Sequence, residues 1–335
     1  MNESDLLLVT GATGLVGSHV VEQARDRGIR TRALVRPSAD ASLLEGWGAE
    51  LCRGDMTDAA SLNTAVDAVT VIVHCAAKVG DWGPTDAYRQ VNVRGVCDLM
   101  DAAQKSNNLK RFVQISSLGV YPARDHYGTD ETEPPNTKGI DGYTLTKVES
   151  EQQVMQRAVD DGFPAVVLRP GFIYGPRDRT VLPRLIERLR SGGFAFLGST
   201  DKLMNNTFVG NLCQAVFAAI ERDNVIGRAY NIRDGRAVTK KEFIETICAS
   251  AGYDMPTKVV PLPVARVLAA GLESLWKLLR REEAPILSSA RIKFLGLNLD
   301  FSIDRAGREL DYDPAADFAD AMKDTVTWFR ENSLT

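Results

Sequence analysis

The sequence predicts an α/β protein whose doubly wound parallel sheet is followed by a smaller, mostly helical C-terminal lobe. Two observations support this fold class. Short apolar segments alternate with helical patterns through the first half of the chain, and a glycine-rich loop stands between the first strand and the first helix. Short buried strands separated by helices are typical of a parallel sheet that helices cover on both faces.

The expected elements follow one another at a regular spacing. The predicted strands cover residues 6–9, 30–35, 48–53, 70–74, 111–115 and 165–168. The predicted helices between them include residues 15–27, 85–105 and 143–160. After Pro170 the alternation ends, because glycine and proline interrupt residues 170–200, a strand and a helix follow at 205–222, and the remaining pattern is mostly helical.

The glycine-rich loop reads TGATGLVG, from Thr10 to Gly17. Its first glycine permits a tight turn, the second lets the backbone approach a pyrophosphate, and the third lets the helix pack closely on the sheet. Free amide groups at the helix N-terminus then face the anion. We therefore predict a Rossmann fold that binds a dinucleotide. The residues expected to contact it here are Gly11, Thr13, Gly14, Leu15, Val16 and Gly17.

The end of the second strand indicates which dinucleotide is bound. Enzymes that use NAD commonly place a carboxylate there, which accepts hydrogen bonds from the adenosine ribose. This chain has Arg36 instead. A guanidinium group suits a 2′-phosphate, so we expect NADP in preference to NAD. The alternative interpretation of Arg36 is a solvated surface arginine.

Further cofactor contacts are expected where other strands end, because the carboxyl ends of parallel strands meet at one edge of the sheet. These residues are Asp55, Met56, Cys75, Ala76, Ala77, Lys78 and Pro170. Residues 1–175 are then expected to form the dinucleotide-binding domain, with 205–235 returning to it. Residues 176–204 and 236–335 are expected to form a substrate-binding lobe across a cleft.

Tyr143 and Lys147 open the helix that follows the fifth strand. Their spacing of four residues places both side chains on one face of that helix. A tyrosine with an ordinary pKa of about 10 exchanges protons inefficiently at neutral pH, and a nearby ammonium group lowers that pKa. We therefore predict that Lys147 lowers the pKa of Tyr143 while it also binds the cofactor ribose.

Two more polar positions fall near this pair. Ser116 and Ser117 end the fifth strand, where a hydroxyl could hold a substrate carbonyl. Asn92 lies inside the expected helix 85–105. It either holds a backbone kink or a water molecule of the proton relay, or it is a buried structural amide.

Composition excludes several classes of protein. The 335 residues include 40 basic and 44 acidic side chains, so the chain has no electrostatic reason to bind nucleic acid or an anionic membrane surface. The five cysteines are scattered and form no CxxC pair, which disfavours a disulfide framework or a metal site. No apolar run is long enough for a signal peptide or a transmembrane helix. We expect a cytoplasmic protein with reduced thiols.

The segments TGATGLVG, HCAA, ISSLGVY, YTLTK and LRPGFIYGP occur in this order. Together they resemble the extended short-chain dehydrogenases/reductases, and the resemblance covers essentially the whole chain. It implies that Tyr143 and Lys147 are catalytic. It also implies that the catalytic serine, four residues before the tyrosine of S-x-x-V-Y, is Ser117 rather than Ser116. A homodimer formed through helices 85–105 and 143–160 is expected from the same resemblance.

Within this family, the segment AAKVGDWGP and two C-terminal segments are similar to the 3β-hydroxysteroid dehydrogenase branch and its bacterial relatives. Those relatives include reductases of β-keto acids and dihydroflavonols. The resemblance implies an oxidoreductase that interconverts a secondary alcohol and a ketone on a small hydrophobic substrate. Substrate contacts are expected from Trp82, Ser117, Tyr174 and Arg177.

Two other functions stay open. A nucleotide-sugar epimerase or dehydratase shares the fold. However, Leu118 and Gly119 follow Ser117 here, in place of the Asp–Glu pair that would resemble a sugar dehydratase. A regulator that senses NADP without chemistry usually lacks the tyrosine–lysine pair kept here.

The apolar residues of 264–279 recur at helical spacing. We interpret this stripe as core of the smaller lobe, with a lid over the substrate or a membrane-surface contact as the alternatives.

Overall fold

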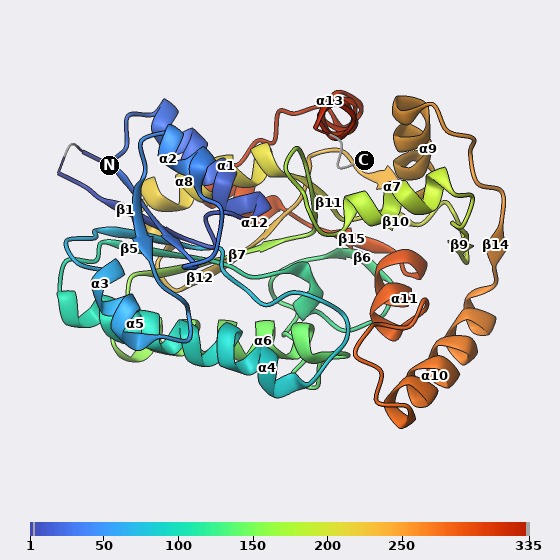
Figure 1. Ribbon diagram of the computed structural model, residues 1–335, viewed down its shortest axis with the longest axis horizontal. Helices are drawn as coiled ribbons and strands as arrows, with labels where there is room; N and C mark the ends of the chain where they lie inside the picture. Colours follow the sequence, from blue (N-terminus) through green and yellow to red (C-terminus); the bar gives the residue numbers. More distant parts are fainter. Residues whose placement is uncertain (3, 333–335) are drawn as a thin grey trace.

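The computed structural model describes residues 1–2 and 4–332, so residue 3 and residues 333–335 of the expected domain ranges lie outside the described part. Seven parallel strands form the central sheet in the order β12-β7-β5-β4-β1-β2-β3 (Figure 1). They are β1 (Leu7–Thr10), β2 (Thr31–Val35), β3 (Glu50–Arg53), β4 (Val71–His74), β5 (Arg111–Ile115), β7 (Ala165–Pro170) and β12 (Arg228–Ile232). The predicted doubly wound fold is confirmed. Strand order reverses between β1 and β4, which creates a crevice at the carboxyl ends of the strands.

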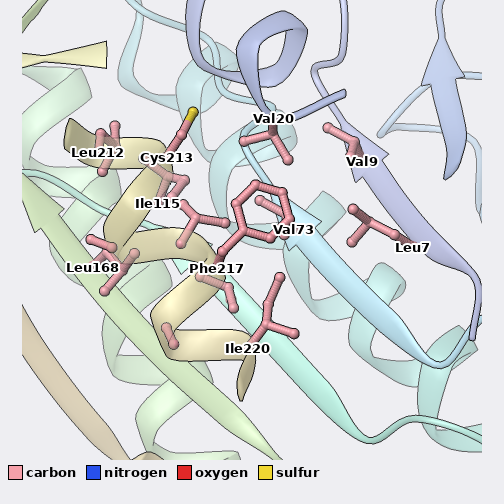
Figure 2. Packing of buried hydrophobic residues seen from close by; sticks show 14 of the residues in the cluster. Leu7, Val9, Val20, Val73, Ile115, Leu168, Leu212, Cys213, Phe217 and Ile220 are labelled. Carbon is pink, nitrogen blue, oxygen red and sulfur yellow. The ribbon is translucent and has the colours of Figure 1, made fainter. Parts of the chain in front are cut away.

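Helices cover both faces of this sheet. One face packs against α1 (Leu15–Asp26) and α8 (Val209–Glu221), and Figure 2 shows Val20 and Phe217 of these helices beside Val9 and Val73 of the strands. The other face packs against α3 (Ala59–Ala65), α5 (Gly95–Ser106) and α6 (Gly142–Asp160). Because both faces are buried, the strands are continuous apolar runs, as the sequence analysis required.

The predicted helix 85–105 is interrupted. It consists of α4 (Thr85–Arg89), a π-helical turn (Gln90–Arg94) and then α5. At the start of α5 the backbone of Gly95 passes close to the loop that follows β3. A Cβ on Gly95 would lie 2.6 Å from the carbonyl oxygen of Met56 in that loop. The wider turn brings Asn92 to a buried position. Single π turns are frequent at functional sites.

The lobe is built from the second half of the chain, and one short strand from the first half, β6 (His126–Thr129), pairs with it. Its largest apolar cluster packs α9 (Lys240–Ala251) and α13 (Phe318–Glu331) beside α7 (Leu182–Arg190). By contrast, α12 (Asp304–Leu310) packs on β12 and α8, so this part of 236–335 joins the sheet domain. Short paired strands complete the lobe and its junction: β6 (His126–Thr129) with β15 (Leu299–Phe301), β8 (Phe172–Tyr174) with β11 (Asn206–Phe208), β9 (Phe196–Leu197) with β14 (Val259–Val260), and β10 (Leu203–Met204) with β13 (Val238–Thr239).

The apolar stripe of 264–279 is not core, so our interpretation of it was wrong. It belongs to α10 (Leu262–Leu278), in which only Ala265 and Ala269 are buried. These two small residues share one face and pack beside Ile292 of α11 (Ser289–Gly296). Val267 is 74% exposed and Leu278 is 79% exposed. Figure 1 shows α10 at the edge of the molecule. Among the described residues, no helix combines the length and apolar character that crossing a membrane requires.

Candidate active site

The glycine loop has the geometry of an anion cradle. Gly11 has φ +64°, and a Cβ there would lie 2.7 Å from the backbone nitrogen of Ala76. A Cβ on Gly17 would lie 2.3 Å from the carbonyl oxygen of Gly11. Gly14 is the N-cap of α1, so the amides of the first turn, which include Leu15 and Val16, have no earlier carbonyl within the helix. This loop fits a dinucleotide pyrophosphate.

A buried pair that the sequence analysis missed holds this loop against β4. The Oγ1 of Thr10 lies 2.8 Å from the Nδ1 of His74, and the backbone nitrogen of Ala76 donates to the same Oγ1 at 3.3 Å. Burial, with the charge of Lys147 adding to it, lowers the pKa of His74 to about 3. His74 is therefore neutral and serves the loop as a fixed hydrogen-bonding partner.

The other predicted cofactor positions lie around the crevice. Cys75, Ala76 and Ala77 follow β4 and are partly exposed, while Arg36 is exposed just after β2. Asp55 accepts hydrogen bonds from the amide and hydroxyl of Thr57, at 2.9 and 2.7 Å. Lys78 is exposed, Pro170 is buried at the end of β7, and the side chain of Met56 is buried in the core. Because the side chains of Met56 and Pro170 are buried, these two residues present mainly backbone atoms to the crevice.

Tyr143 and Lys147 are placed by a capped helix start. The Oδ1 of Asp141 accepts a hydrogen bond from the amide of Thr144 at 2.7 Å, which begins α6 at Gly142. One turn after Tyr143, the Nζ of Lys147 donates to the carbonyl oxygen of Ile115 at 2.7 Å. That Nζ lies 5.9 Å from the centre of the Tyr143 ring. The pair therefore sits at the carboxyl end of β5.

The pKa of Tyr143 corrects one prediction. Burial raises this pKa to about 12, the charge of Asp141 adds to the increase, and a hydrogen bond from Ser117 opposes it. Burial also lowers the pKa of Lys147 to about 8, against the opposing charges of Cys75 and Glu151. The expected lowering of the Tyr143 pKa was wrong, because burial of the phenol, with the charge of Asp141 adding to it, sets the direction of the shift. Tyr143 is protonated at neutral pH.

The two adjacent serines have different partners. The Oγ of Ser116 is buried and donates to the Oε2 of Glu151 at 2.7 Å. The Oγ of Ser117 accepts from the amide of Gly119 at 2.9 Å, and it lies near enough to Tyr143 to oppose the rise in the pKa of the phenol that burial causes. Successive strand residues point to opposite sides, and here Ser117 points to the tyrosine.

A buried ionic network supports the site, and the sequence analysis did not find it. The Nε of Arg169 donates to Glu151 at 3.0 Å, and its Nη1 donates to the hydroxyl of Tyr121 at 2.7 Å. That hydroxyl donates in turn to the Oδ1 of Asn231 at 2.9 Å. These residues come from α6, β7, β12 and the loop after β5, so no local spacing could have indicated that they meet.

Asn92 has a structural position. Its Oδ1 accepts from the amide of Lys78 at 2.7 Å, and its Nδ2 donates to the carbonyl of Lys78 and to the Oγ1 of Thr146, both at 3.0 Å. From the π-helical turn it thus ties the loop after β4 to α6. Of the roles left open above, these contacts match the buried structural amide.

A cleft of about 800 Å³ reaches the first turn of α6. It is lined by parts of 78–87, 138–145 and 273–290, with Trp82 and Trp276 as its aromatic residues. The Nε1 of Trp82 donates to the carbonyl of Arg281 at 2.9 Å, which joins the sheet domain to the segment after α10. A partly apolar concave site of this size is typical of small-molecule binding.

Two predicted substrate contacts lie elsewhere. Tyr174 is fully buried in the lobe core, with its hydroxyl 3.0 Å from Asp234. Arg177 donates to Glu22 at 2.6 Å and to Ser18 at 3.2 Å, both on α1. These partners give both side chains structural positions. They are therefore not part of the substrate site proposed below.

Known proteins resemble this chain in sequence and in structure. The model of the NAD dependent epimerase/dehydratase family matches residues 7–232. A 4-hydroxy-2-methyl-3-oxo-4-farnesyl-3,4-dihydroquinoline-1-oxide ketoreductase of Stigmatella aurantiaca is 31% identical, over 91% of this chain and 90% of the relative. A 3 beta-hydroxysteroid dehydrogenase/Delta 5-->4-isomerase of Mycobacterium tuberculosis is 31% identical, over 96% of this chain and 90% of the relative. The crystal structure of gox2253 is 29% identical and covers 98% of this chain and 99% of its own, with a TM-score of 0.84.

Proposed function

The chain belongs to the NAD dependent epimerase/dehydratase family and is an oxidoreductase of the extended short-chain dehydrogenase/reductase type, and we propose that it interconverts a ketone and a secondary alcohol on a hydrophobic small molecule. The observation that carries this proposal is the position of Tyr143 on the first turn of α6, one helical turn from Lys147, whose Nζ is held at the carboxyl end of β5 where Ser117 follows. Two of the relatives described above, one named as a ketoreductase and one as a steroid dehydrogenase, support this type of reaction.

The residues of the chain would act as follows. A nicotinamide cofactor in the crevice supplies or accepts the hydride. Ser117 and Tyr143 hold the substrate carbonyl by hydrogen bonds, and Tyr143 delivers its proton to the oxygen as the carbonyl is reduced. An alkoxide is more basic than a phenolate, so the raised pKa of Tyr143 still permits this transfer. In the reverse direction Tyr143 must first lose its proton, and Lys147 stabilises the phenolate that forms.

Arg36 supports NADP as the preferred cofactor. It is exposed directly after β2. In calorimetric titration, we expect NADP⁺ to bind more tightly than NAD⁺, and Arg36→Ala to reduce that preference by about tenfold, since a charge-assisted hydrogen bond contributes about 1.5 kcal/mol or more. Equal affinities in the unmodified protein would overturn this assignment.

The cleft supports a substrate with a flat apolar part. Two tryptophans line it, as do several cations, among them Lys138 and Lys277. The aromatic faces suit a steroid-like, flavonoid-like or long-chain substrate, and the cations suit an acidic group such as that of a β-keto acid. The same cations would also serve the diphosphate of a nucleotide sugar, which makes an epimerase the second candidate.

Two experiments test the proposal. The first is a panel of steroids, β-keto acids, flavonoids and nucleotide sugars, followed at the nicotinamide absorbance with both cofactors. Turnover of a nucleotide sugar without net absorbance change would favour the epimerase. Cofactor binding without any turnover would favour a regulator.

The second experiment is Tyr143→Phe, which removes the proton donor and keeps the ring. We expect kcat to fall by about 10²- to 10⁴-fold, with cofactor affinity nearly unchanged. Tyr127→Phe is the matched control, because Tyr127 is exposed on β6, and its activity should equal that of the unmodified protein. Full turnover by Tyr143→Phe would exclude the proposed role.

A further inference from the structure

A lysine of the lobe contacts the backbone of the catalytic loop. Lys293 belongs to α11 and is only 9% exposed. Its Nζ donates to the carbonyl oxygens of Gly119 and Tyr121, both at 2.6 Å. The lysine is separated from them by more than 170 residues of sequence, so α11 reaches the site only through the packing of the lobe on the sheet domain.

The contacted backbone is the part that orients Ser117. A 3₁₀ turn (Leu118–Val120) begins at Ser117, whose Oγ accepts from the amide of Gly119 at 2.9 Å. Gly119 is therefore held on both sides, by Ser117 through its nitrogen and by Lys293 through its oxygen. A Cβ on Gly119 would lie 3.0 Å from the Oγ of Ser117, so there is little space for the turn to move toward the serine.

The helix that carries Lys293 is anchored to the other side of the site. Ser288, the N-cap of α11, donates its hydroxyl hydrogen to the Oδ2 of Asp81 at 3.0 Å. The Nε of Arg291 donates to the same oxygen at 3.0 Å. Because Asp81 lies in the loop after β4, α11 is attached to that loop as well as to the turn after β5.

Lys293 also brings a charge to the site. Burial lowers the pKa of Lys293 to about 8, so its ammonium group is charged at neutral pH. Burial raises the pKa of the half-buried Asp141, which caps α6; hydrogen bonds from Thr144 and the charge of Lys293 oppose this rise, and Asp81 adds to it. Asp141 in turn raises the pKa of Tyr143, second to burial. On the opposite side of Tyr143, Lys147 faces Cys75, His74 and Glu151. Lys293 is thus a positive charge near Asp141, the carboxylate that raises the pKa of Tyr143 and so opposes its ionisation.

We propose that Lys293 is a positioning residue for the reaction: its two backbone hydrogen bonds hold the turn that orients Ser117, and its charge balances Asp141 beside Tyr143. This proposal rests on the proposed function. It makes seating of α11 on the sheet domain a condition of full activity, although no atom of Lys293 touches the reacting groups.

The first test does not depend on activity. Hydrogen exchange of peptides spanning 117–121 is compared between the unmodified protein, Lys293→Met and Lys293→Gln, with exposed Lys323→Met on α13 as the matched control. We expect exchange in Lys293→Met to be at least tenfold faster than in the unmodified protein. Exchange in Lys293→Gln, which keeps a donor, should be faster than in the unmodified protein but slower than in Lys293→Met, and exchange in Lys323→Met should be unchanged. Unchanged exchange in Lys293→Met, or in Lys293→Gln should the methionine variant fail to fold, would overturn the proposal.

The second test is a readout that a purely structural role would not move. We expect Lys293→Met to lower kcat for carbonyl reduction by about tenfold with KM nearly unchanged, because a turn that is free to move no longer orients Ser117 in the transition state. Lys293→Arg, which keeps the donors and the charge, should restore most of kcat, and Lys293→Gln should lie between the two. Unchanged kcat in Lys293→Met, or an equal loss in Lys293→Met and Lys293→Arg, would overturn the positioning role.

The two proposals fail separately. If the unmodified protein turns over no substrate of the panel, the proposed function fails, and the exchange experiment alone decides whether Lys293 holds the turn. If turnover is present and Lys293→Met keeps both kcat and KM, the inference about Lys293 fails while the proposed function stands.

Discussion

The sheet side of the molecule and the lobe side differ in how they hold their side chains. On the sheet side, Arg169 and Glu151 are buried charges with several hydrogen bonds each, donated and accepted across elements remote in sequence. On the lobe side, α10 buries only two alanines and exposes its large apolar residues. Substitutions on the sheet side should therefore affect folding and chemistry together. Substitutions on α10 should leave stability almost unchanged.

The largest expected effect comes from the buried ion pair. Arg169→Met leaves Glu151 charged and buried without its partner, which costs about 3–5 kcal/mol. On the lobe, Arg190 and Glu187 form an exposed pair within α7, and Arg190→Met should change the free energy of unfolding little, because water screens the pair. Urea denaturation of both variants measures the difference. Similar losses would show that the two sides do not differ as described.

Substitution of a glycine by alanine should destabilise the protein on the sheet side and stabilise it on the lobe side. At Gly17 the new Cβ would overlap the carbonyl of Gly11, and we expect a loss of about 1–3 kcal/mol or more, together with weaker cofactor binding. At Gly271 in α10 a Cβ meets no atom within 4 Å, and alanine should stabilise the helix by about 0.5–1 kcal/mol. Thermal unfolding and cofactor titration check both. Destabilisation by Gly271→Ala would contradict the open position of α10.

The pH dependence sharpens the sheet side further. Burial lowers the pKa of Lys147 to about 8, so the ammonium is lost above that pH. We expect kcat/KM for carbonyl reduction to decline above pH 8, and the decline to move upward in Lys147→Arg. Because the unfolded lysine keeps its proton up to its ordinary pKa, Lys147 should also make the protein more stable as pH rises above about 8. A profile in Lys147→Arg identical to that of the unmodified protein would exclude Lys147 as the titrating group.

The smallest effect is expected on α10 itself. Val267→Ser and Leu278→Ser remove apolar side chains that are already exposed, so the free energy of unfolding should change by less than about 0.5 kcal/mol. If α10 is only a wall of the cleft, kcat should also stay constant. The matched substitution Val166→Ser, in the buried strand β7, should be strongly destabilising in the same assay.

The sequence by itself determined the features that depend on neighbouring residues. Apolar runs predicted six strands of the sheet within one or two residues, since a strand buried on both faces must be apolar along its length. The glycine loop and the four-residue spacing of Tyr143 and Lys147 were also recognisable, because turns and helix faces depend on local geometry. The cofactor preference implied by Arg36, the homodimer and the cytoplasmic location stay predictions.

Only the tertiary structure decided which side chains are buried and with what. The stripe of α10 has the period of a core helix, but the structure buries only its two alanines and leaves Val267 and Leu278 exposed. The pKa of Tyr143 rises because the phenol is buried and Asp141 lies nearby, and Lys293 reaches the catalytic loop from the far end of the chain. Desolvation and charge depend on every group within a few ångströms, and those groups come from segments that sequence spacing cannot bring together.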